Sequence, residues 1–335
     1  MKETKSILLS EHFADLERVY SSKVLEKLEE TAGLDRTFYN KASVLQDPEA
    51  FKSTEYIFST WGMPSLDEKE IAGYFPNLKC VFYAAGSVQY FAEPFLKSGI
   101  KVFSAWAANA VPVADYTAAQ IVLALKGFFA SSRLNKISRK EARARFAEYP
   151  GVFDETVGII GAGMIGKMVI QRLNDLHLKC LVFDPFLPEE RAKELNVTKC
   201  SLEELFGKSF VVSNHLANNE QTRGMLDYKL FSLMRRNAAF INTGRGAQVV
   251  EADLVKLLEE RPDITAILDV TDPEPPVEGH AFYKLENCIL TPHIAGSSGN
   301  EVHRMAEYMA EEYRKYISGE PTSYEVSLAM LKTMA

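Results

Sequence analysis

A glycine-rich hexapeptide, GAGMIG, is the feature that most constrains how this chain can fold. Gly161, Gly163 and Gly166 form the pattern G-x-G-x-x-G, which follows the apolar run TVGII and precedes the helical run KMVIQRLNDLH. In such a turn the first glycine permits a tight bend, the second lets a pyrophosphate approach the backbone, and the third lets helix and strand pack closely. The amino terminus of the helix adds free N–H groups and a positive dipole end. The motif therefore predicts a strand–turn–helix unit that binds a dinucleotide.

An acidic residue at the end of the next apolar run indicates which dinucleotide is bound. Asp184 lies 18 residues after Gly166, close to the spacing of about 20 expected for the acid that holds the adenosine ribose. A carboxylate accepts hydrogen bonds from both ribose hydroxyls but repels a 2′-phosphate. No arginine occurs among the six residues that follow Asp184. We therefore expect the cofactor to be NAD rather than NADP.

Short apolar runs alternate with helical patterns along most of the chain, and this rhythm predicts parallel α/β sheets. Before the long central helix the expected strands are SILLS, EYIFST, KCVFYAA and KVFSA. After Glu155 the expected strands are TVGII, CLVFD, FVVSN, AAFIN, ITAILDV and CILTP. The long helix is expected to begin after Asn109 and Pro112. The predicted fold class is α/β, with two doubly wound parallel-sheet domains.

Composition excludes several other classes of protein. The formal net charge of -7 argues against nucleic-acid binding, and we interpret the basic stretch RLNKISRKEARAR as a solvated helix face. The most apolar helical stretch, YTAAQIVLAL, is too short to span a bilayer, and the amino terminus does not resemble a signal peptide. Cys80, Cys180, Cys200 and Cys288 form no CxxC pair, which argues against a zinc site and a secreted disulfide framework. We expect a cytoplasmic protein with no metal.

Three later apolar runs end in polar residues. AAFIN leads to Arg245, ITAILDV leads to Asp269 and then Glu274, and CILTP leads to His293. Because ligands of open α/β sheets bind outside the carboxyl ends of the strands, we expect these side chains to meet at one edge of the sheet. An arginine, a carboxylate and a histidine together are suited to hydride transfer that is coupled to movement of a proton.

Each of the three side chains has a chemical role in such a reaction. His293 is the candidate acid/base, because histidine is the side chain that titrates near neutrality. Glu274 is the candidate partner that would bond the other ring nitrogen and favour the imidazolium form. Arg245 can donate two parallel hydrogen bonds to a substrate carboxylate. His215 is a competing histidine at a strand end, but no carboxylate follows it closely, so we place it in the cofactor crevice.

Each motif also has an ordinary structural interpretation. A single histidine after a proline is more often structural than catalytic, DPEPP is compatible with a rigid loop, and GRG with an exposed turn. Their joint occurrence behind a dinucleotide motif favours the catalytic interpretation.

The sequence resembles the D-isomer-specific 2-hydroxy acid dehydrogenases, which are NAD-dependent. The motifs that carry the resemblance are GIIGAGMIG, FDP, INTGRG, LDVTDPEPP and LTPHIAG, in family order and at family-like spacings. The resemblance implies a Rossmann nucleotide-binding domain at residues 109–296, inserted into a flavodoxin-like substrate-binding domain at residues 1–108 and 297–335. It also implies a homodimer formed through the helical arm before Gly151.

The resemblance further assigns roles to individual residues. Arg245 resembles the substrate-binding arginine, Glu274 the partner of the histidine, and His293 the acid/base. The positions that match cofactor contacts are Gly161, Gly163, Met164, Ile165, Gly166, Asp184, Ala217, Thr222, Thr243 and Asp269, the last being the acid near the nicotinamide. The positions expected on the substrate side, besides Arg245, are Ala85, Gly86 and Trp61.

Three departures from the family pattern affect these expectations. Met164 replaces a frequent arginine, which removes one charged phosphate contact, and Ala217 stands where a proline is common. The stretch AAGSVQYF replaces a family glycine loop that ends in Asn or Asp, although the amides of Ala85 and Gly86 can still hold a carboxylate. The stretches FSTWGMPSL and AAGSVQYF contain no Lys or Arg, so we expect a small unphosphorylated 2-oxo or D-2-hydroxy acid as the substrate.

Two alternatives differ in function. An NADH-sensing corepressor-like regulator with little turnover would have the same dinucleotide-binding glycine turn, but such proteins generally carry disordered tails. Formate dehydrogenase-like chemistry fits less well, because that group pairs its histidine with Gln rather than with a Glu such as Glu274.

Overall fold

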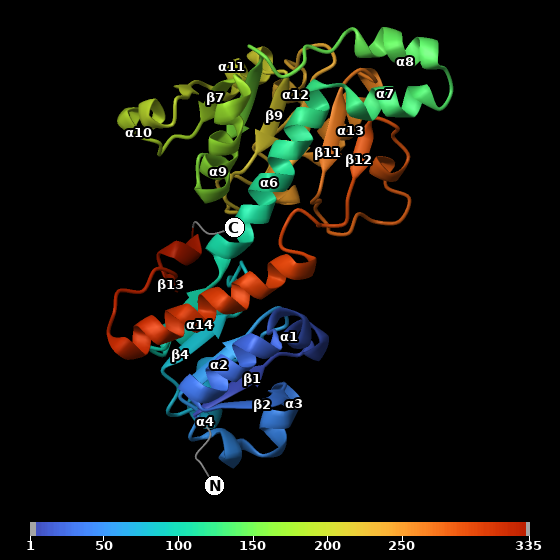
Figure 1. Ribbon diagram of the computed structural model, residues 1–335. Helices are drawn as coiled ribbons and strands as arrows, with labels where there is room; N and C mark the ends of the chain where they lie inside the picture. Colours follow the sequence, from blue (N-terminus) through green and yellow to red (C-terminus); the bar gives the residue numbers. More distant parts are fainter. Residues whose placement is uncertain (1–4, 333–335) are drawn as a thin grey trace. The chain divides into compact units, whose positions relative to one another are not determined.

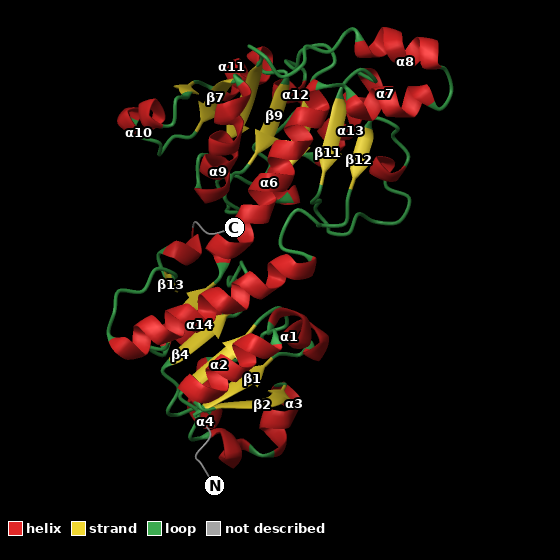
Figure 2. Ribbon diagram, viewed as in Figure 1, coloured by secondary structure: helices red, strands yellow, loops and turns green. Residues whose placement is uncertain are grey.

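The computed structural model describes residues 5–332, which divide into two compact units. One unit comprises the described residues up to Ala110 and from Ser297 onward, and the other comprises Val111–Gly296. The second unit is therefore inserted, in chain order, between the two segments of the first. Each unit is a sheet of mainly parallel strands with helices packed on it (Figures 1 and 2).

The first unit has a six-stranded sheet. Its strands are β1 (Ser6–Leu9), β2 (Leu34–Tyr39), β3 (Tyr56–Ser59), β4 (Cys80–Tyr83), β5 (Lys101–Ser104) and β13 (Glu325–Val326). The order across the sheet is β13-β5-β4-β3-β1-β2, and all pairs are parallel except β13 with β5. The five parallel strands thus have the flavodoxin-like order.

Helices cover both faces of this first sheet. They are α1 (Phe13–Val19), α2 (Ser22–Ala32), α3 (Lys41–Gln46), α4 (Glu68–Tyr74), α5 (Ala92–Lys97) and α14 (His303–Ser318). Successive strand residues point to opposite faces, so Phe58 and Phe82 pack with α1, α2 and α14, whereas Ile57 and Val81 pack with α3, α4 and α5. Burial on both faces explains the near-continuous apolar runs of the sequence.

The second unit has a seven-stranded parallel sheet. Its strands are β6 (Thr156–Ile160), β7 (Lys179–Phe183), β8 (Thr198–Lys199), β9 (Val211–Asn214), β10 (Ala239–Asn242), β11 (Thr265–Leu268) and β12 (Cys288–Leu290). The order across the sheet is β12-β11-β10-β9-β6-β7-β8. The chain builds the sheet outward from β6 in one direction through β7 and β8, and then in the other direction from β9. The glycine motif directly follows β6. This is the doubly wound order, and the reversal is the place where ligands bind in such sheets.

Helices pack on both faces of the second sheet as well (Figure 1). They are α6 (Trp106–Leu125, shared with the end of the first unit), α7 (Phe128–Asn135), α8 (Arg139–Phe146), α9 (Met164–Leu173), α10 (Glu189–Glu194), α11 (Leu202–Lys208), α12 (Tyr228–Phe231) and α13 (Glu251–Glu260). Apolar residues of α6 and α9 join one core cluster, and those of α11, α12 and α13 join the other. The prediction of two doubly wound α/β sheets is confirmed.

The secondary structure differs from expectation at the start of one helix and at three strands. The long helix begins at Trp106 rather than after Pro112, which lies inside it. An interior proline removes one N–H hydrogen bond and crowds the carbonyl one turn earlier. Burial of Ala107, Ala108 and Ala110 in the same helix outweighs this cost. Strands β2, β8 and β13 were not expected. The sequence LDRTFY of β2 lies at the sheet edge and is only partly buried, and β8 and β13 have two residues each.

Among the described residues, no single helix is long and apolar enough to cross a membrane. Helices α6 and α7, bent by 60° relative to each other, meet the length and composition criteria only as a pair.

Candidate functional site

The glycine turn after β6 has no room for larger residues at two of its three positions. A Cβ at Gly161, whose φ is +87°, would lie 2.7 Å from the carbonyl oxygen of His215, and a Cβ at Gly166 would lie 2.0 Å from the carbonyl oxygen of Gly161. At Gly163 a Cβ would meet no atom within 4 Å, and this residue is the amino-terminal cap of α9. The turn therefore leaves an open approach at the start of a helix, which fits a pyrophosphate.

Met164 and Ile165 are the first two residues of α9. The first N–H groups of a helix have no partner within the helix, so these two amides are available to an anion. Their contacts to the phosphates stay a prediction. The phosphates would be held by backbone amides and the helix dipole, because Met164 supplies no charge of its own.

Asp184 follows β7 directly and joins the glycine turn to the next loop. One carboxylate oxygen accepts the Ala162 N–H at 2.7 Å, and the other accepts the Phe186 N–H at 2.8 Å. Sequence reasoning assigned this carboxylate to a ribose and did not anticipate these contacts. Each oxygen has a second acceptor site, so the carboxylate can hold the backbone and still accept ribose hydroxyls.

The strands β10, β11 and β12 are neighbours in the sheet, and each is followed by one of the predicted residues. Arg245 follows β10, Asp269 follows β11, and His293 follows β12. Since all three strands are parallel, these residues lie at the same edge as the glycine turn after β6.

His293 and Glu274 form a hydrogen-bonded pair. Nδ1 of His293 lies 2.6 Å from Oε1 of Glu274, and the side chains are 47% and 37% exposed. The backbone at His293 is in the left-handed region, with φ of 53°, and its N–H donates to the carbonyl oxygens of Asp269 and Thr291. Within the described residues Nε2 has no hydrogen-bond partner. A half-exposed ring with one nitrogen held and the other open is suited to exchange a proton with a ligand.

Asp269 is 2% exposed and fixes the loop that carries His293. Its Oδ1 accepts hydrogen bonds from the Thr291 hydroxyl at 2.6 Å and the Ile294 N–H at 2.8 Å, and its Oδ2 accepts the Ala295 N–H at 2.9 Å. Each bond to this carboxylate is charge-assisted, which makes it stronger than a neutral one. Asp269 therefore determines where the backbone of His293 lies.

The turn that carries Arg245 is packed against the loop that leads to Glu274. A Cβ at Gly246 would lie 2.0 Å from the carbonyl carbon of Thr271, so only glycine allows the two backbones to touch. Burial lowers the pKa of the Arg245 guanidinium, and the negative charge of Glu274 partly offsets this effect. Its Nη1 donates to the carbonyl oxygen of Gly244 at 2.8 Å. A partly buried guanidinium is suited to bind an anionic ligand.

Three buried amide side chains, those of Asn214, Asn242 and Gln248, hold the Arg245 turn in place. They were not predicted from the sequence. Nδ2 of Asn214 donates to Asn242 at 3.0 Å and to Gln248 at 2.7 Å. Oε1 of Gln248 also accepts the Arg245 N–H at 3.1 Å, and Nδ2 of Asn242 donates to the Arg245 carbonyl at 3.0 Å. The available signal was a polar residue at the end of each of two apolar strands.

His215 is held in a different environment from His293. Its Nε2 lies 2.9 Å from the Ser213 hydroxyl, and its Nδ1 is buried without a partner in the described structure. Burial lowers the pKa of His215 to about 4. His215 is therefore neutral near pH 7 and is poorly suited to donate a proton there.

The other predicted cofactor positions have structural contacts of their own. The Thr222 hydroxyl donates to the Ala217 carbonyl at 2.6 Å, which closes the loop after β9. The Thr243 hydroxyl lies 3.0 Å from that of Thr117 on α6. These contacts neither require nor exclude a bound dinucleotide.

The predicted substrate residues Ala85, Gly86 and Trp61 belong to the first unit. The buried Ser104 hydroxyl lies 2.9 Å from the Ala85 carbonyl oxygen and 2.6 Å from that of Gly86, which turns these carbonyls inward. The guanidinium of Arg18 lies 5.1 Å from the centre of the Trp61 ring. Sequence reasoning missed this arginine, because it lies on α1 rather than in either predicted loop.

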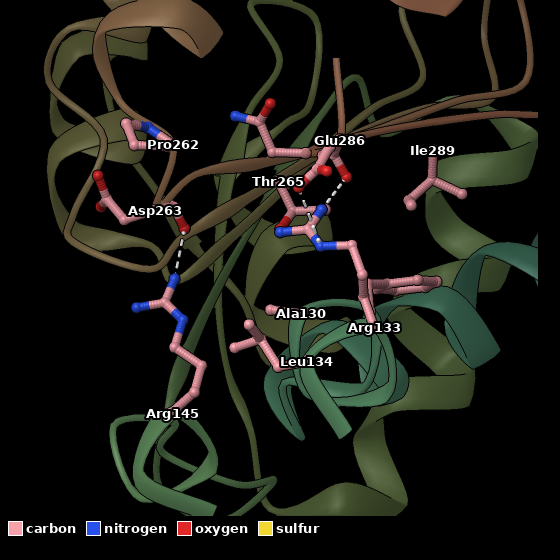
Figure 3. Close-up of a pocket in the computed structure, with 11 residues that line it drawn as sticks. Ala130, Arg133, Leu134, Arg145, Pro262, Asp263, Thr265, Glu286 and Ile289 are labelled. Carbon is pink, nitrogen blue, oxygen red and sulfur yellow. Dashed lines mark hydrogen bonds and ion pairs between the residues drawn. The ribbon is translucent and has the colours of Figure 1, made fainter. Parts of the chain in front are cut away.

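A cavity of about 260 Å³ lies at the opposite edge of the second sheet, where β11 and β12 begin (Figure 3). Arg145 donates to the Asp263 carbonyl at 3.1 Å, and Arg133 donates to the Glu286 carbonyl. None of the predicted site residues lines this cavity. In the described part of the chain, no group of three or more His, Cys, Asp or Glu side chains is placed to hold a metal ion.

Comparisons with known proteins bear on the family and the fold. Residues 120–295, more than half of the chain, match the family model described as D-isomer specific 2-hydroxyacid dehydrogenase, NAD binding domain. A D-3-phosphoglycerate dehydrogenase of Bacillus subtilis is 30% identical over 237 residues, which are 70% of this chain and 45% of that protein. A glyoxylate reductase of Korarchaeum cryptofilum is 32% identical over 252 residues, which are 73% of this chain and 75% of that protein.

A solved structure extends the likeness to nearly the whole chain. It is a D-isomer specific 2-hydroxyacid dehydrogenase of Lactobacillus delbrueckii ssp. bulgaricus in an NAD complexed form. Its TM-score is 0.77 at 18% identity, covering 97% of this chain and all of that one, so the likeness concerns the fold. The chain spans less than half the length of the phosphoglycerate dehydrogenase that it matches. With a family match on this scale, the chain belongs to the D-isomer specific 2-hydroxyacid dehydrogenase family, and NAD is the dinucleotide that its second unit binds.

Proposed function

We propose that this protein is an NAD-dependent oxidoreductase that interconverts a small unphosphorylated 2-oxo acid and the corresponding D-2-hydroxy acid. The observation that carries the proposal is the His293–Glu274 pair, 2.6 Å apart, at the sheet edge that also bears Arg245 and the glycine turn. A proton donor, an anion-binding group and a dinucleotide cradle are the parts that reduction of a 2-oxo acid needs.

Each residue has a defined part in this reaction. Arg245 binds the carboxylate of the substrate and its carbonyl oxygen through the planar guanidinium, which fixes the orientation of C2. His293 donates the proton from Nε2 to the developing alkoxide, while Glu274 holds Nδ1 and stabilises the imidazolium. NADH, when bound, supplies the hydride. In the reverse direction His293 accepts the hydroxyl proton from the D-2-hydroxy acid.

The two units divide the work in this proposal. The unit at Val111–Gly296 binds NAD and supplies the acid/base, with Asp184 on the ribose. The unit with Ala85, Gly86 and Trp61 binds the substrate, and the backbone amides of the first two hold its carboxylate.

The preference for an unphosphorylated substrate rests on the charge of the substrate side. Neither predicted loop contains Lys or Arg. Arg18, which lies against Trp61, is paired with Asp15 at 2.9 Å, so its charge is already balanced. Relatives named D-3-phosphoglycerate dehydrogenase make the phosphorylated alternative the one to test directly.

The decisive experiment measures NADH oxidation by the purified protein against a panel of 2-oxo acids that includes glyoxylate and 3-phosphohydroxypyruvate. We expect the highest kcat/KM for an unphosphorylated member, with the D-enantiomer of the hydroxy acid as product. A preference for 3-phosphohydroxypyruvate would contradict the substrate assignment. Tight NADH binding without turnover of any member would instead favour an NADH-sensing regulator.

We also propose a homodimer formed through the arm, defined as residues 128–146, which contain helices α7 and α8 and the turn between them. The arm exposes Ile137, Phe128 and Phe146, at 79%, 49% and 39% of their surface, and α7 buries no residue of its own. Such an apolar group on a surface is typical of an interface. Light scattering after size-exclusion chromatography should give a mass twice that of the chain, and Ile137→Asp should shift it toward the monomer. A parent protein that is monomeric at micromolar concentration would contradict the proposal.

A further inference from the structure

Phe186 is the most exposed large apolar side chain in the described part of the chain, at 87% of its surface. A phenyl ring usually stabilises a protein by being buried, and this ring is not. Single exposed apolar residues are common on proteins, so exposure alone does not indicate a role. The role of Phe186 is indicated by its place in the loop after β7, the strand next to β6 and the glycine turn.

The backbone that carries Phe186 is fixed although the ring is free. The Phe186 N–H donates to Oδ1 of Asp184 at 2.8 Å, and the next residue, Leu187, is 4% exposed. The Leu187 carbonyl accepts a hydrogen bond from Nζ of Lys199 on β8 at 2.6 Å. The loop therefore presents the ring from a held position, and binding a ligand would require little ordering of the chain.

The order of the strands indicates which part of the dinucleotide reaches this loop. This step rests on the proposed function, because it takes the nicotinamide to lie near Arg245 and His293, beyond β10, β11 and β12. The pyrophosphate binds at the glycine turn after β6, on the side of the sheet toward β7. A dinucleotide extended along this edge must then place its adenosine beyond β7. Asp184 and Phe186 follow β7, so the ribose acid and the exposed ring lie at the adenosine end.

We propose that Phe186 stacks on the adenine of bound NAD and sets the affinity for the adenosine half of the cofactor. Asp184 links the glycine turn to the loop that carries Phe186, because its carboxylate accepts both the Ala162 N–H and the Phe186 N–H. Stacking of a base on an aromatic ring contributes about 1–3 kcal/mol, which corresponds to roughly five- to 150-fold in affinity.

The test measures binding of ADP-ribose, which contains the adenosine and the pyrophosphate but has no nicotinamide. Isothermal titration calorimetry compares the parent protein with Phe186→Ser, Phe186→Leu and Phe186→Tyr. Phe153→Ser is the matched control, because Phe153 is 68% exposed in the same unit but precedes β6, at the opposite edge of the sheet. A Phe186→Trp variant adds an optical signal beyond the two natural tryptophans.

We expect Phe186→Ser to weaken ADP-ribose binding at least fivefold, Phe186→Leu to weaken it less, and Phe186→Tyr and Phe153→Ser to stay within twofold of the parent. Fluorescence of Phe186→Trp should be quenched by ADP-ribose more than that of the parent. Unchanged affinity in Phe186→Ser, or an equal loss in Phe153→Ser, would overturn the proposal. Because ADP-ribose binding needs no 2-oxo acid, a lack of turnover would count against the proposed function alone.

Discussion

The two units have sheets of the same type, but the carboxyl edges of these sheets are built from different chemistry. In the second unit the edge carries charged and titratable side chains, among them Arg245, Asp269 and His293. In the first unit, strands β3, β4 and β5 are followed directly by the uncharged residues Thr60, Ala84 and Ala105, whereas Glu11, His12 and Lys41 follow β1 and β2. There the Ser10 hydroxyl donates to the Trp61 carbonyl at 2.7 Å, and the Thr60 hydroxyl donates to the Ala84 carbonyl at 2.9 Å. The fold therefore sets where a ligand binds, and the residues at the edge set what is done to it.

Under the proposed function, the carboxyl edge of the second sheet (the second edge) performs the chemistry, and that of the first sheet (the first edge) helps to bind the substrate. Changes at the second edge should then alter turnover or cofactor binding, whereas changes at the first edge should alter KM.

The largest effect is expected at His293. His293→Gln removes the proton donor, so turnover should fall by a hundred- to ten-thousandfold, the usual worth of general acid–base catalysis. Stopped-flow oxidation of NADH and a fluorescence titration of NADH measure the two quantities separately. NADH affinity should stay within twofold, and near-normal turnover would show that another group supplies the proton.

A somewhat smaller loss is expected at Arg245. Arg245→Lys keeps the charge but loses the planar pair of donors, so kcat/KM for 2-oxo acids should fall by about 2–4 kcal/mol. Steady-state kinetics with NADH titrations provide the check. If the variant weakened NADH binding and left 2-oxo acid kinetics unchanged, Arg245 would be a cofactor ligand and the contrast between the edges would need revision.

His215 sharpens the comparison within the second edge, because it is a histidine without a proton-transfer role. Its pKa in the folded protein, about 4, lies below the ordinary value of 6.5. The unfolded chain therefore binds the proton more readily between these values, and folding stability should fall as the pH falls from about 6.5 to 4. His215→Gln should remove about 2 kcal/mol of this acid-dependent loss between pH 7 and pH 4.5. Denaturant unfolding at both pH values, without added nucleotide, measures it. An unchanged pH dependence in the variant would contradict the assignment.

Asp184 tests cofactor choice at the second edge. Asp184→Ser removes the charge that repels a 2′-phosphate, so the preference for NADH over NADPH should narrow by about tenfold. It also removes the acceptors of the Ala162 and Phe186 amides, so absolute NADH affinity should fall. The ratio of kcat/KM for the two cofactors is the measurement. A parent enzyme that uses NADPH as well as NADH would already contradict the prediction.

The smallest effect is expected at the first edge. A Cβ at Gly86 would meet its nearest neighbour, Nδ2 of Asn109, at 3.4 Å, which is ordinary contact. Gly86→Ala should therefore leave the melting temperature within a few degrees and raise KM by about threefold, because the methyl group narrows the approach to the backbone. A fall in kcat with KM unchanged would instead place chemistry at this edge.

The parts of this structure that follow from local pattern were predictable from the sequence. The glycine turn, Asp184 and the three strand-end residues each lie within a few positions of an apolar run, so the glycine motif and the ends of these runs locate them. Strand β2 was missed because its residues are only partly buried at the sheet edge, so no apolar run marks it. The start of α6 was misplaced because Pro112 has a strong local preference that buried neighbours override.

The residues that hold the site in place were not predictable in the same way. Asn214, Asn242 and Gln248 form one network, although up to 34 positions separate them in the sequence. Arg18 lies against Trp61 from another helix. Such contacts depend on which strands become neighbours, and one sequence does not reveal that order. The ligand-facing groups therefore follow from motifs, whereas their supports require the fold.

The contact at Gly246 also limits how the protein can be recombined with its relatives. Because the Gly246 and Thr271 backbones touch, the turn with Arg245 and the loop with Glu274 can change only in step. A chimera whose crossover falls between positions 246 and 271 would combine two loops from different proteins, whose backbones need not fit against each other. Crossovers outside that interval would keep the matched pair together. Residues 244–274 should therefore be exchanged as one block when loops are moved between members of the family.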